Sequence, residues 1–229
     1  MVIGNGLLAN AFSEYKESKN YLFFCSGVSN SLCKEQSEFD REINLLSENI
    51  AAHPEMTFVY FSTCSVYDPS MVNSLYVKHK LRIEEIIKAS CQHFHIFRLS
   101  NVVGHTKNPV TILNFLYSAV KTGSKFNLWK KSKRNLIDVE DVVLIVKEII
   151  GRKILNNATV NIANPHSYNV TEIVSQIEQY LGKKGDYDLV EQGGAYVIDI
   201  EPIQEIIKEL GINFDDSYFQ RLLVKYYPK

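Results

Sequence analysis

Short apolar runs alternate with longer segments of helical periodicity along this chain, and that alternation narrows its fold more than any other feature. The runs YLFF and FVYF are apolar at every position, as in strands that are covered on both faces. Such alternation is typical of parallel βαβ units, so we predict an α/β fold with a doubly wound parallel sheet. Strands are expected at residues 1–3, 21–26, 57–62, 94–99 and 159–163, and helices at residues 6–17, 34–53, 75–90, 109–122, 139–151, 169–182 and 201–210.

Beyond about residue 105 the strands become sparse and helical segments dominate. We therefore predict a sheet domain at residues 1–105, to which residues 135–165 contribute, and a smaller, mainly helical C-terminal lobe at residues 106–229. The most turn-rich part of that lobe is GKKGDYDLVEQGG, residues 182–194. Ligands of such sheets bind beyond the carboxyl ends of the strands, so functional residues are expected just after the first, third and fourth strands.

Charge and cysteine content exclude several classes of function. With 25 basic and 26 acidic residues the formal net charge is −1, which gives no attraction for nucleic acid or an anionic membrane. A small molecule is therefore the expected partner. The N-terminal stretch MVIGNGLLANAF is followed too soon by polar residues for a signal or a membrane span, so the cytoplasm is the expected compartment. No metal site is predicted, because no CxxC pair or metal-ligand spacing involves Cys25, Cys33, Cys64 or Cys91, which are expected to be reduced.

A glycine motif follows the first strand. Gly4, Gly6 and Ala9 satisfy G-x-G-x-x-A at the start of a predicted helix. Glycine permits close approach of the backbone to a pyrophosphate, and the helix N-terminus offers free N–H groups to the anion. The same spacing also serves helix packing alone, so both interpretations stay open. Residues 24–30 contain no Asp, Glu or Arg to read a ribose, so NAD and NADP are not distinguished.

A tyrosine and a lysine share one face of the helix predicted at residues 75–90. Tyr76 and Lys80 are four residues apart, which places the phenol beside the ammonium. A nearby cation favours the phenolate and makes a tyrosine a competent general acid or base. The pattern also arises by chance, because Tyr117 and Lys121 repeat it in the same chain.

Three hydroxyls, those of Ser62, Thr63 and Ser65, stand at the end of the preceding strand. One of them is expected to hydrogen-bond a substrate oxygen beside the tyrosine. His79 lies in the same helix and is expected to point away from the tyrosine–lysine face as a structural residue.

Seven motifs in order resemble the extended short-chain dehydrogenase/reductase superfamily, the NAD-dependent epimerase/dehydratase group that acts largely on nucleotide sugars. The resemblance implies a Rossmann-like domain with a substrate lobe, NAD or NADP as the cofactor, and a nucleotide-sugar substrate. Whether the chain forms a homodimer is left open. The motifs are GNGLLA, FFCSGVSNS, FSTCSVYD, YVKHK, FRLSNVVG, RNLIDVEDVV and VNIANPHSYNVTEIVSQI.

The resemblance also implies a role for each residue that matches a motif. Tyr76 becomes the acid/base, Lys80 its pKa-lowering and ribose-binding partner, and Thr63 the hydroxyl that holds the substrate oxygen. Asn101 and Arg134 are assigned to the sugar or phosphates of the substrate, with a loop-capping Asn and a solvated Arg as alternatives. The implied cofactor contacts are Gly4, Gly6, Leu7, Ala9, Ser26, Gly27, Ser62, Tyr76 and Lys80, and the implied substrate contacts are Thr63, Ser65, Asn101 and Arg134.

The chain is abbreviated relative to this family. Only residues 18–20 separate the first helix from YLFFCSGVSN, where family members usually have two further strands that build the adenosine side of the cofactor site. Thr63 and Tyr76 are 13 positions apart, fewer than is usual, which implies a more open substrate loop. The helix asparagine that often completes the catalytic group has no secure counterpart, because Asp40 or Arg41 stands there.

These features predict an NAD(P)-dependent oxidoreductase or epimerase that acts on a nucleotide sugar, with an implied role in surface polysaccharide biosynthesis. Dehydration is disfavoured, because Cys64 and Ser65 stand where dehydratases of the family carry two acidic side chains. The alternative is a degenerate, non-catalytic nucleotide-binding module that acts as a sensor or scaffold.

Overall fold

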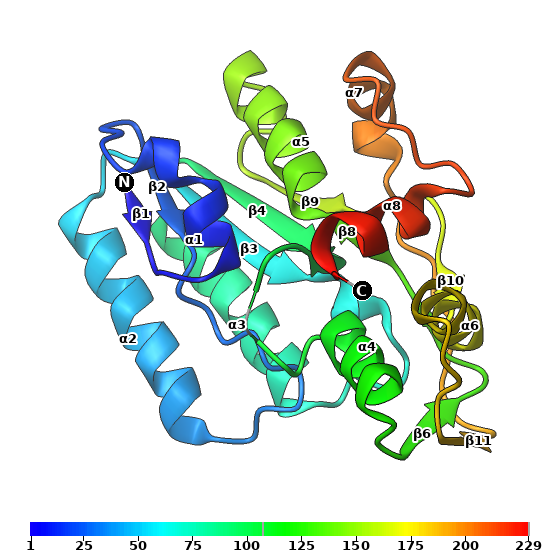
Figure 1. The fold of residues 1–229 in the computed structure, drawn as a ribbon. Helices are drawn as coiled ribbons and strands as arrows, with labels where there is room; N and C mark the ends of the chain where they lie inside the picture. The colour runs from blue at the N-terminus through cyan, green and yellow to red at the C-terminus, as the bar shows by residue number, and fades with distance from the viewer. Residues whose placement is uncertain (107, 229) are drawn as a thin grey trace.

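A five-stranded parallel sheet forms the centre of the protein (Figure 1), as seen in a computed structural model that describes residues 1–106 and 108–228. The prediction of an α/β fold with a parallel sheet is therefore confirmed. Neighbouring strands are parallel throughout, and β3 and β4 have the longest register. The strand order is β1 (Val2–Ile3), β2 (Tyr21–Phe24), β3 (Thr57–Thr63), β4 (Phe94–Leu99) and β9 (Ala158–Ile162).

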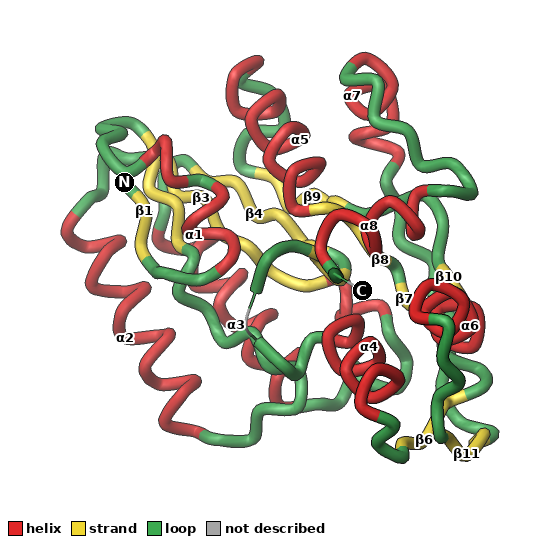
Figure 2. The backbone as a smooth tube through the Cα atoms, viewed as in Figure 1, coloured by secondary structure: helices red, strands yellow, loops and turns green. Residues whose placement is uncertain are grey.

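Helices cover both faces of this sheet (Figure 2), because alternate residues of the buried strands point to opposite sides. On one side Phe23 and Phe61 pack with α1 (Leu7–Ala11) and α5 (Val139–Arg152) in the larger core. On the other side α2 (Gln36–Ala52) and α3 (Leu75–Ser90) are packed on the sheet. The second core consists of Leu22, Phe24, Leu46, Met56, Phe58, Tyr60, Ile83, Ile87, Phe94 and Ile96.

The first strand lies at the edge of the sheet. Within the described residues β1 pairs with β2 alone, through Val2 with Phe23 and Ile3 with Phe24. The tight connection through residues 18–20 leaves no room for further strands between these two. The described part of the sheet therefore ends at β1, as the short connection predicts.

The C-terminal part contains more structure than the sequence pattern indicates. Helices α4 (Ile112–Thr122), α6 (Val170–Leu181) and α7 (Gln204–Glu209) were expected, although a 3-10 turn forms the first residues of the last segment. Helix α8 (Tyr218–Tyr226) was not predicted. The further strands, each paired in a two-stranded sheet, are β5 (Asn101–Val103) with β8 (Leu136–Asp138), β6 (Phe126–Trp129) with β11 (Tyr187–Val190), and β7 (Lys133–Arg134) with β10 (Tyr168–Asn169).

Strand β9 returns the chain to the sheet after the α4 and α5 segments, beside β4. The division between a sheet domain and a C-terminal lobe near residue 105 stays a prediction. All four cysteines are free. No helix in the described ranges has the length and apolar character needed to cross a membrane.

Candidate active site

The polar end of β3 is held by hydrogen bonds. Ser62 Oγ donates to Glu84 Oε1 at 2.6 Å, and Arg98 Nη2 donates to Glu84 Oε2 at 2.7 Å. Thr63 Oγ1 accepts the Ser65 backbone N–H at 3.0 Å and so caps the 3-10 turn that follows the strand. Ser62 is thus part of a buried ion-pair network, whereas Thr63 gives its own proton to no other described residue.

Helix α3 places the predicted tyrosine and lysine together. Ser74 Oγ accepts the Val77 backbone N–H at 3.1 Å, and this cap starts the helix directly before Tyr76. Lys80 Nζ lies 5.9 Å from the centroid of the Tyr76 ring. Both side chains are buried, and the Tyr76 hydroxyl makes no hydrogen bond to another residue in the described part of the chain.

A buried carboxylate that the motifs did not indicate lies beside this pair. Glu42 of α2 is fully buried, and its Oε1 accepts hydrogen bonds from Lys80 Nζ at 3.1 Å and from the Tyr60 hydroxyl at 2.8 Å. Its Oε2 accepts the Val28 backbone N–H at 2.6 Å and lies 2.9 Å from His79 Nε2. Lys80 Nζ also donates to the Tyr60 hydroxyl at 2.9 Å.

His79 was expected to point away from the tyrosine–lysine face, and this is wrong because its ring reaches the same carboxylate as Lys80. His79 and Lys80 are successive residues, so they point in different directions around α3. Helix α2 nevertheless brings one carboxylate within reach of both, and the His79 ring stacks on Phe39 of α2 with centroids 4.6 Å apart. His79 shares Glu42 with the lysine rather than standing apart from it.

The electrostatics of this cluster are those of a buried ion pair. Burial opposes ionisation of Glu42, but the Lys80 charge and the hydrogen bonds from His79, Val28 and Tyr60 outweigh it and lower the pKa of Glu42 to about 2. Burial, followed by the Glu42 charge, raises the pKa of Tyr60 well above its usual value. At neutral pH the cluster thus contains a carboxylate and a neutral Tyr60 phenol beside the lysine.

Gly27 covers the ammonium. A Cβ atom at this position would lie 2.6 Å from Lys80 Nζ and 2.9 Å from Glu42 Oε1, so a larger residue fits only if the pair moves. Only 3% of the Lys80 surface is exposed. The lysine is therefore engaged by protein groups, and its role in ribose binding stays a prediction.

The glycine loop lies next to the end of β2. Gly4 has φ +124° and would bring a Cβ atom to 2.7 Å from the Cys25 carbonyl oxygen, so this position requires glycine. Gly6 has open space around it. Ser26 Oγ accepts a hydrogen bond of 3.3 Å from Arg41 Nη1, so α2 contributes a guanidinium beside the predicted cofactor contacts.

The two apolar positions of the glycine motif are used in packing. Ala9 is buried on α1. The Leu7 side chain lies against Gly104, where a Cβ atom would be 2.8 Å from Leu7 Cδ1. The first turn of α1 thus packs against the end of β5, close to the predicted site.

The predicted substrate residues Asn101 and Arg134 lie in β5 and β7, which follow β4 along the chain. Asn101 Nδ2 donates to the Asn135 carbonyl at 2.8 Å, and Arg134 Nη1 lies 3.8 Å from Asp68 Oδ2. The Asn101 side chain thus ties β5 to the start of β8, and its role toward a substrate stays a prediction. Beside them is a cavity of about 270 Å³ that is lined by Lys133, Asn135, Asn164, Pro165, Ser167, Ala195, Tyr196, Val197 and Ile198.

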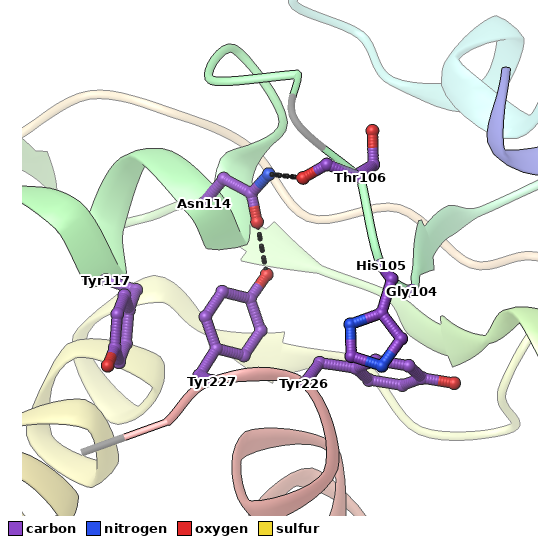
Figure 3. A pocket seen from close by; sticks show the side chains of 7 residues that line it. All are labelled: Gly104, His105, Thr106, Asn114, Tyr117, Tyr226 and Tyr227. Carbon is purple, nitrogen blue, oxygen red and sulfur yellow. Dashed lines mark hydrogen bonds between the residues drawn. The ribbon is translucent and has the colours of Figure 1, made fainter.

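A second cavity, of about 400 Å³, lies between α4, the end of β5 and the C-terminal segment (Figure 3). The Tyr227 hydroxyl donates to Asn114 Oδ1 at 2.5 Å, and the Tyr117 hydroxyl donates to the Pro228 carbonyl. The chance pair Tyr117 and Lys121 therefore anchors the C-terminal segment. Neither cavity is lined by Thr63, Tyr76 or Lys80, and this second one is lined by Gly104, His105, Thr106, Asn114, Tyr117, Tyr226 and Tyr227.

No cluster of metal-ligating side chains occurs in residues 1–106 and 108–228. The sequence motifs did not point to Glu42, His79 or Arg41 as site residues. A signal was present only in the helical spacing, since Phe39, Glu42 and Leu46 form one stripe of α2 that faces α3 and the sheet. An acidic residue in such a stripe needs a buried partner.

The structure is similar to solved structures of sugar-nucleotide enzymes. The dTDP-glucose 4,6-dehydratase from Bacillus anthracis, in complex with NAD, matches with a TM-score of 0.69 and 20% identity over 96% of this chain and 75% of that chain. The ADP-L-glycero-D-manno-heptose-6-epimerase from Helicobacter pylori matches with a TM-score of 0.66 and 20% identity, over 94% and 75% of the two chains. The UDP-N-acetylglucosamine 4-epimerase from Methanobrevibacter ruminantium matches with a TM-score of 0.67 and 15% identity, over 94% and 78%.

These identities establish the fold alone. Comparison with curated protein sequences finds no match. The model of the NAD dependent epimerase/dehydratase family matches residues 36–163, which is more than half of the chain and extends from α2 through β9. The protein therefore belongs to the NAD-dependent epimerase/dehydratase family.

Proposed function

We propose that this protein is an NAD(P)-dependent oxidoreductase or epimerase that acts on a nucleotide sugar. The observation that carries the proposal is the placement of Tyr76 beside Lys80 on α3, next to the end of β3 that bears Thr63. The family and the fold of the sugar-nucleotide enzymes supply the reaction class. Without that context, a tyrosine four residues before a lysine would carry little weight.

The residues of this chain fit part of a dinucleotide. Gly4 and Gly6 add no side chain to the loop before α1, in which Asn5 is exposed, and the space around Gly6 is open to a diphosphate. The first-turn N–H groups of a helix have no partner within the helix and suit such an anion. Arg41, which pairs with Glu38 at 3.2 Å, places a guanidinium beside Ser26 near this loop. On the adenosine side, the edge position of β1 removes the wall that a further strand provides, and NAD and NADP stay undistinguished.

In the proposed reaction Tyr76 exchanges a proton with the hydroxyl or carbonyl oxygen of the sugar. The nicotinamide, when bound, supplies a hydride to the sugar carbon that bears this oxygen or accepts one from it. Thr63 donates its free hydroxyl proton to that oxygen, and its own position is set by the bond from the Ser65 N–H. Lys80, paired with Glu42, is the charged group beside the Tyr76 phenol. Because Cys64 and Ser65 provide no acidic side chain, we favour reduction or epimerisation over dehydration.

For the substrate, we propose that Arg134 binds a phosphate and that Asn101 lies near the sugar or diphosphate. Arg134 is partly exposed, with 21% of its side chain accessible. Its Nη1 donates to the Lys133 carbonyl at 2.8 Å and lies 3.8 Å from Asp68 Oδ2, and we assign the rest of the guanidinium to a phosphate. The adjoining cavity of about 270 Å³ offers amide and hydroxyl groups for a sugar. A role in surface polysaccharide biosynthesis is part of this proposal by analogy with the family.

A second candidate function is a non-catalytic nucleotide-binding module. The observation that favours it is the state of Lys80, whose ammonium is covered by Gly27 and neutralised by Glu42. The edge position of β1 points the same way, because it weakens the grip on a cofactor.

Turnover separates the two functions. The protein with each nicotinamide cofactor is incubated with UDP-, dTDP-, GDP- and ADP-sugars, and products are separated by chromatography. The enzyme proposal expects conversion of at least one sugar and a loss of about 100-fold or more in kcat for Tyr76→Phe. Full turnover by Tyr76→Phe would exclude Tyr76 as the acid/base. The Tyr117→Phe variant, altered at the other tyrosine of the same spacing, is the matched control.

A further inference from the structure

Glu42 connects the parts of the molecule that surround the tyrosine–lysine pair. Its carboxylate contacts the loop after β2 through Val28, strand β3 through Tyr60, and helix α3 through His79 and Lys80. We propose that Glu42 is a positioning residue that holds the Lys80 ammonium beneath Gly27 and offsets the positive charge that Lys80 exerts on Tyr76. Its meaning for catalysis rests on the proposed function.

The geometry leaves the carboxylate little freedom. Both oxygens are occupied, Oε1 by Tyr60 and Lys80 and Oε2 by Val28 and His79, at distances of 2.6–3.1 Å. A fully buried carboxylate with this set of partners is fixed in place. The direction of the Lys80 side chain is therefore set by Glu42 and Tyr60.

The charges around Tyr76 follow from this arrangement. Lys80 Nζ is 5.9 Å from the Tyr76 ring centroid and 3.1 Å from Glu42 Oε1. Standing alone at this distance, the ammonium would exert the field of a full positive charge on the ring. The opposite charge beside it cancels a large part of that field. Tyr76 is thus exposed to a nearly neutral pair rather than to a free cation.

The other ionisable groups near the pair lie on four segments. Tyr60 comes from β3, His79 from α3, and Cys33 from the segment before α2, where it packs in the same apolar cluster as Tyr76. Further along α3, Glu84 is matched by Arg98 of β4 at 2.7 Å. Lys80 donates to the neutral Tyr60 hydroxyl and to Glu42, and of these two acceptors only the Glu42 carboxylate is charged. It is therefore the group that compensates the lysine charge.

The NMR signal of Tyr76 at pH 7, in protein labelled with ¹³C at the tyrosine ζ carbons, tests this inference without substrate or cofactor. The Tyr76 signal is identified by its loss in Tyr76→Phe. Glu42→Gln removes the charge that holds and balances Lys80, so the Tyr76 signal is expected to shift from its position in the parent. Lys121→Met, at the second pair of the same spacing, should leave that signal in place. A Tyr76 signal at the same position in the parent and in folded Glu42→Gln would overturn the proposal.

A neutral double variant keeps the test valid if Glu42→Gln does not fold. Replacing both members of a buried ion pair is better tolerated than replacing one. In Glu42→Gln/Lys80→Met the two lost charges cancel, so the Tyr76 signal is expected to lie closer to its parent position than in Lys80→Met alone. A signal displaced as far in the double variant as in Lys80→Met would overturn the proposal. Such a failure leaves the proposed function standing, because the turnover assay is independent of it.

Discussion

We expect Glu42→Gln to change the free energy of unfolding by an amount that depends on pH. The Glu42 pKa is lowered from its usual 4.5 to about 2 in the folded protein, which corresponds to about 3 kcal/mol of stabilisation at neutral pH. Because the folded-state pKa is depressed, this stabilisation is complete above pH 4.5 and is lost as the pH falls through about 2. The variant lacks the titrating group. Its stability deficit relative to the parent should therefore be at least about 3 kcal/mol at pH 7 and about 2 kcal/mol smaller at pH 3.

Urea unfolding of both proteins at pH 7 and pH 3, followed by circular dichroism, measures this deficit. Taking the difference between parent and variant removes the contribution of other carboxylates that titrate in both. Glu48→Gln, on the exposed face of the same helix, is the control and should show no deficit at either pH. A deficit for Glu42→Gln that is equal at the two pH values would refute the assignment of Glu42 as the paired carboxylate.

Three further variants probe the supports of the site. Gly27→Ala should destabilise the fold by about 1–3 kcal/mol in urea unfolding, because the added Cβ displaces Lys80 Nζ; an unchanged midpoint would contradict this. Ser74→Ala removes the N-cap of α3 and should lower stability by about 1 kcal/mol, whereas an unaltered thermal midpoint would argue against the cap. Tyr226→Phe removes a hydrogen bond of 2.6 Å to Asp138 and should lower the stability of the fold by about 2 kcal/mol in thermal unfolding. A variant as stable as the parent would contradict this.

The central sheet was predictable because its strands carry an unambiguous pattern. The fully apolar runs around Phe23 and Phe58 are short and typical of strands that are covered on both faces, and the longer helices are periodic. Strand β11 was not predicted, because YDLV lies among turn-forming residues and two of its four side chains are exposed. Helix α8 follows a polar segment and was missed, although its apolar residues recur at helical spacing at positions 218, 219, 222, 223 and 226.

The site was predictable where a motif fixes spacing along the chain and not where it depends on packing. Tyr76 and Lys80 are four apart on one helix, so their proximity follows from helical geometry alone. The contact between Lys80 and Glu42 joins residues 38 positions apart and depends on how α2 packs on α3. The same holds for Gly27, whose lack of a side chain makes sense only with Lys80 beneath it.

Cofactor binding decides whether the protein is an enzyme of this class, because the proposed reaction depends on a nicotinamide and β1 lies at the edge of the sheet. Calorimetric titration of the protein with NAD, NADH, NADP and NADPH is the measurement. We expect binding of at least one of the four, and weaker binding by Arg41→Ala. Absence of binding of all four at millimolar concentration would contradict the enzyme function and leave the non-catalytic module as the better description.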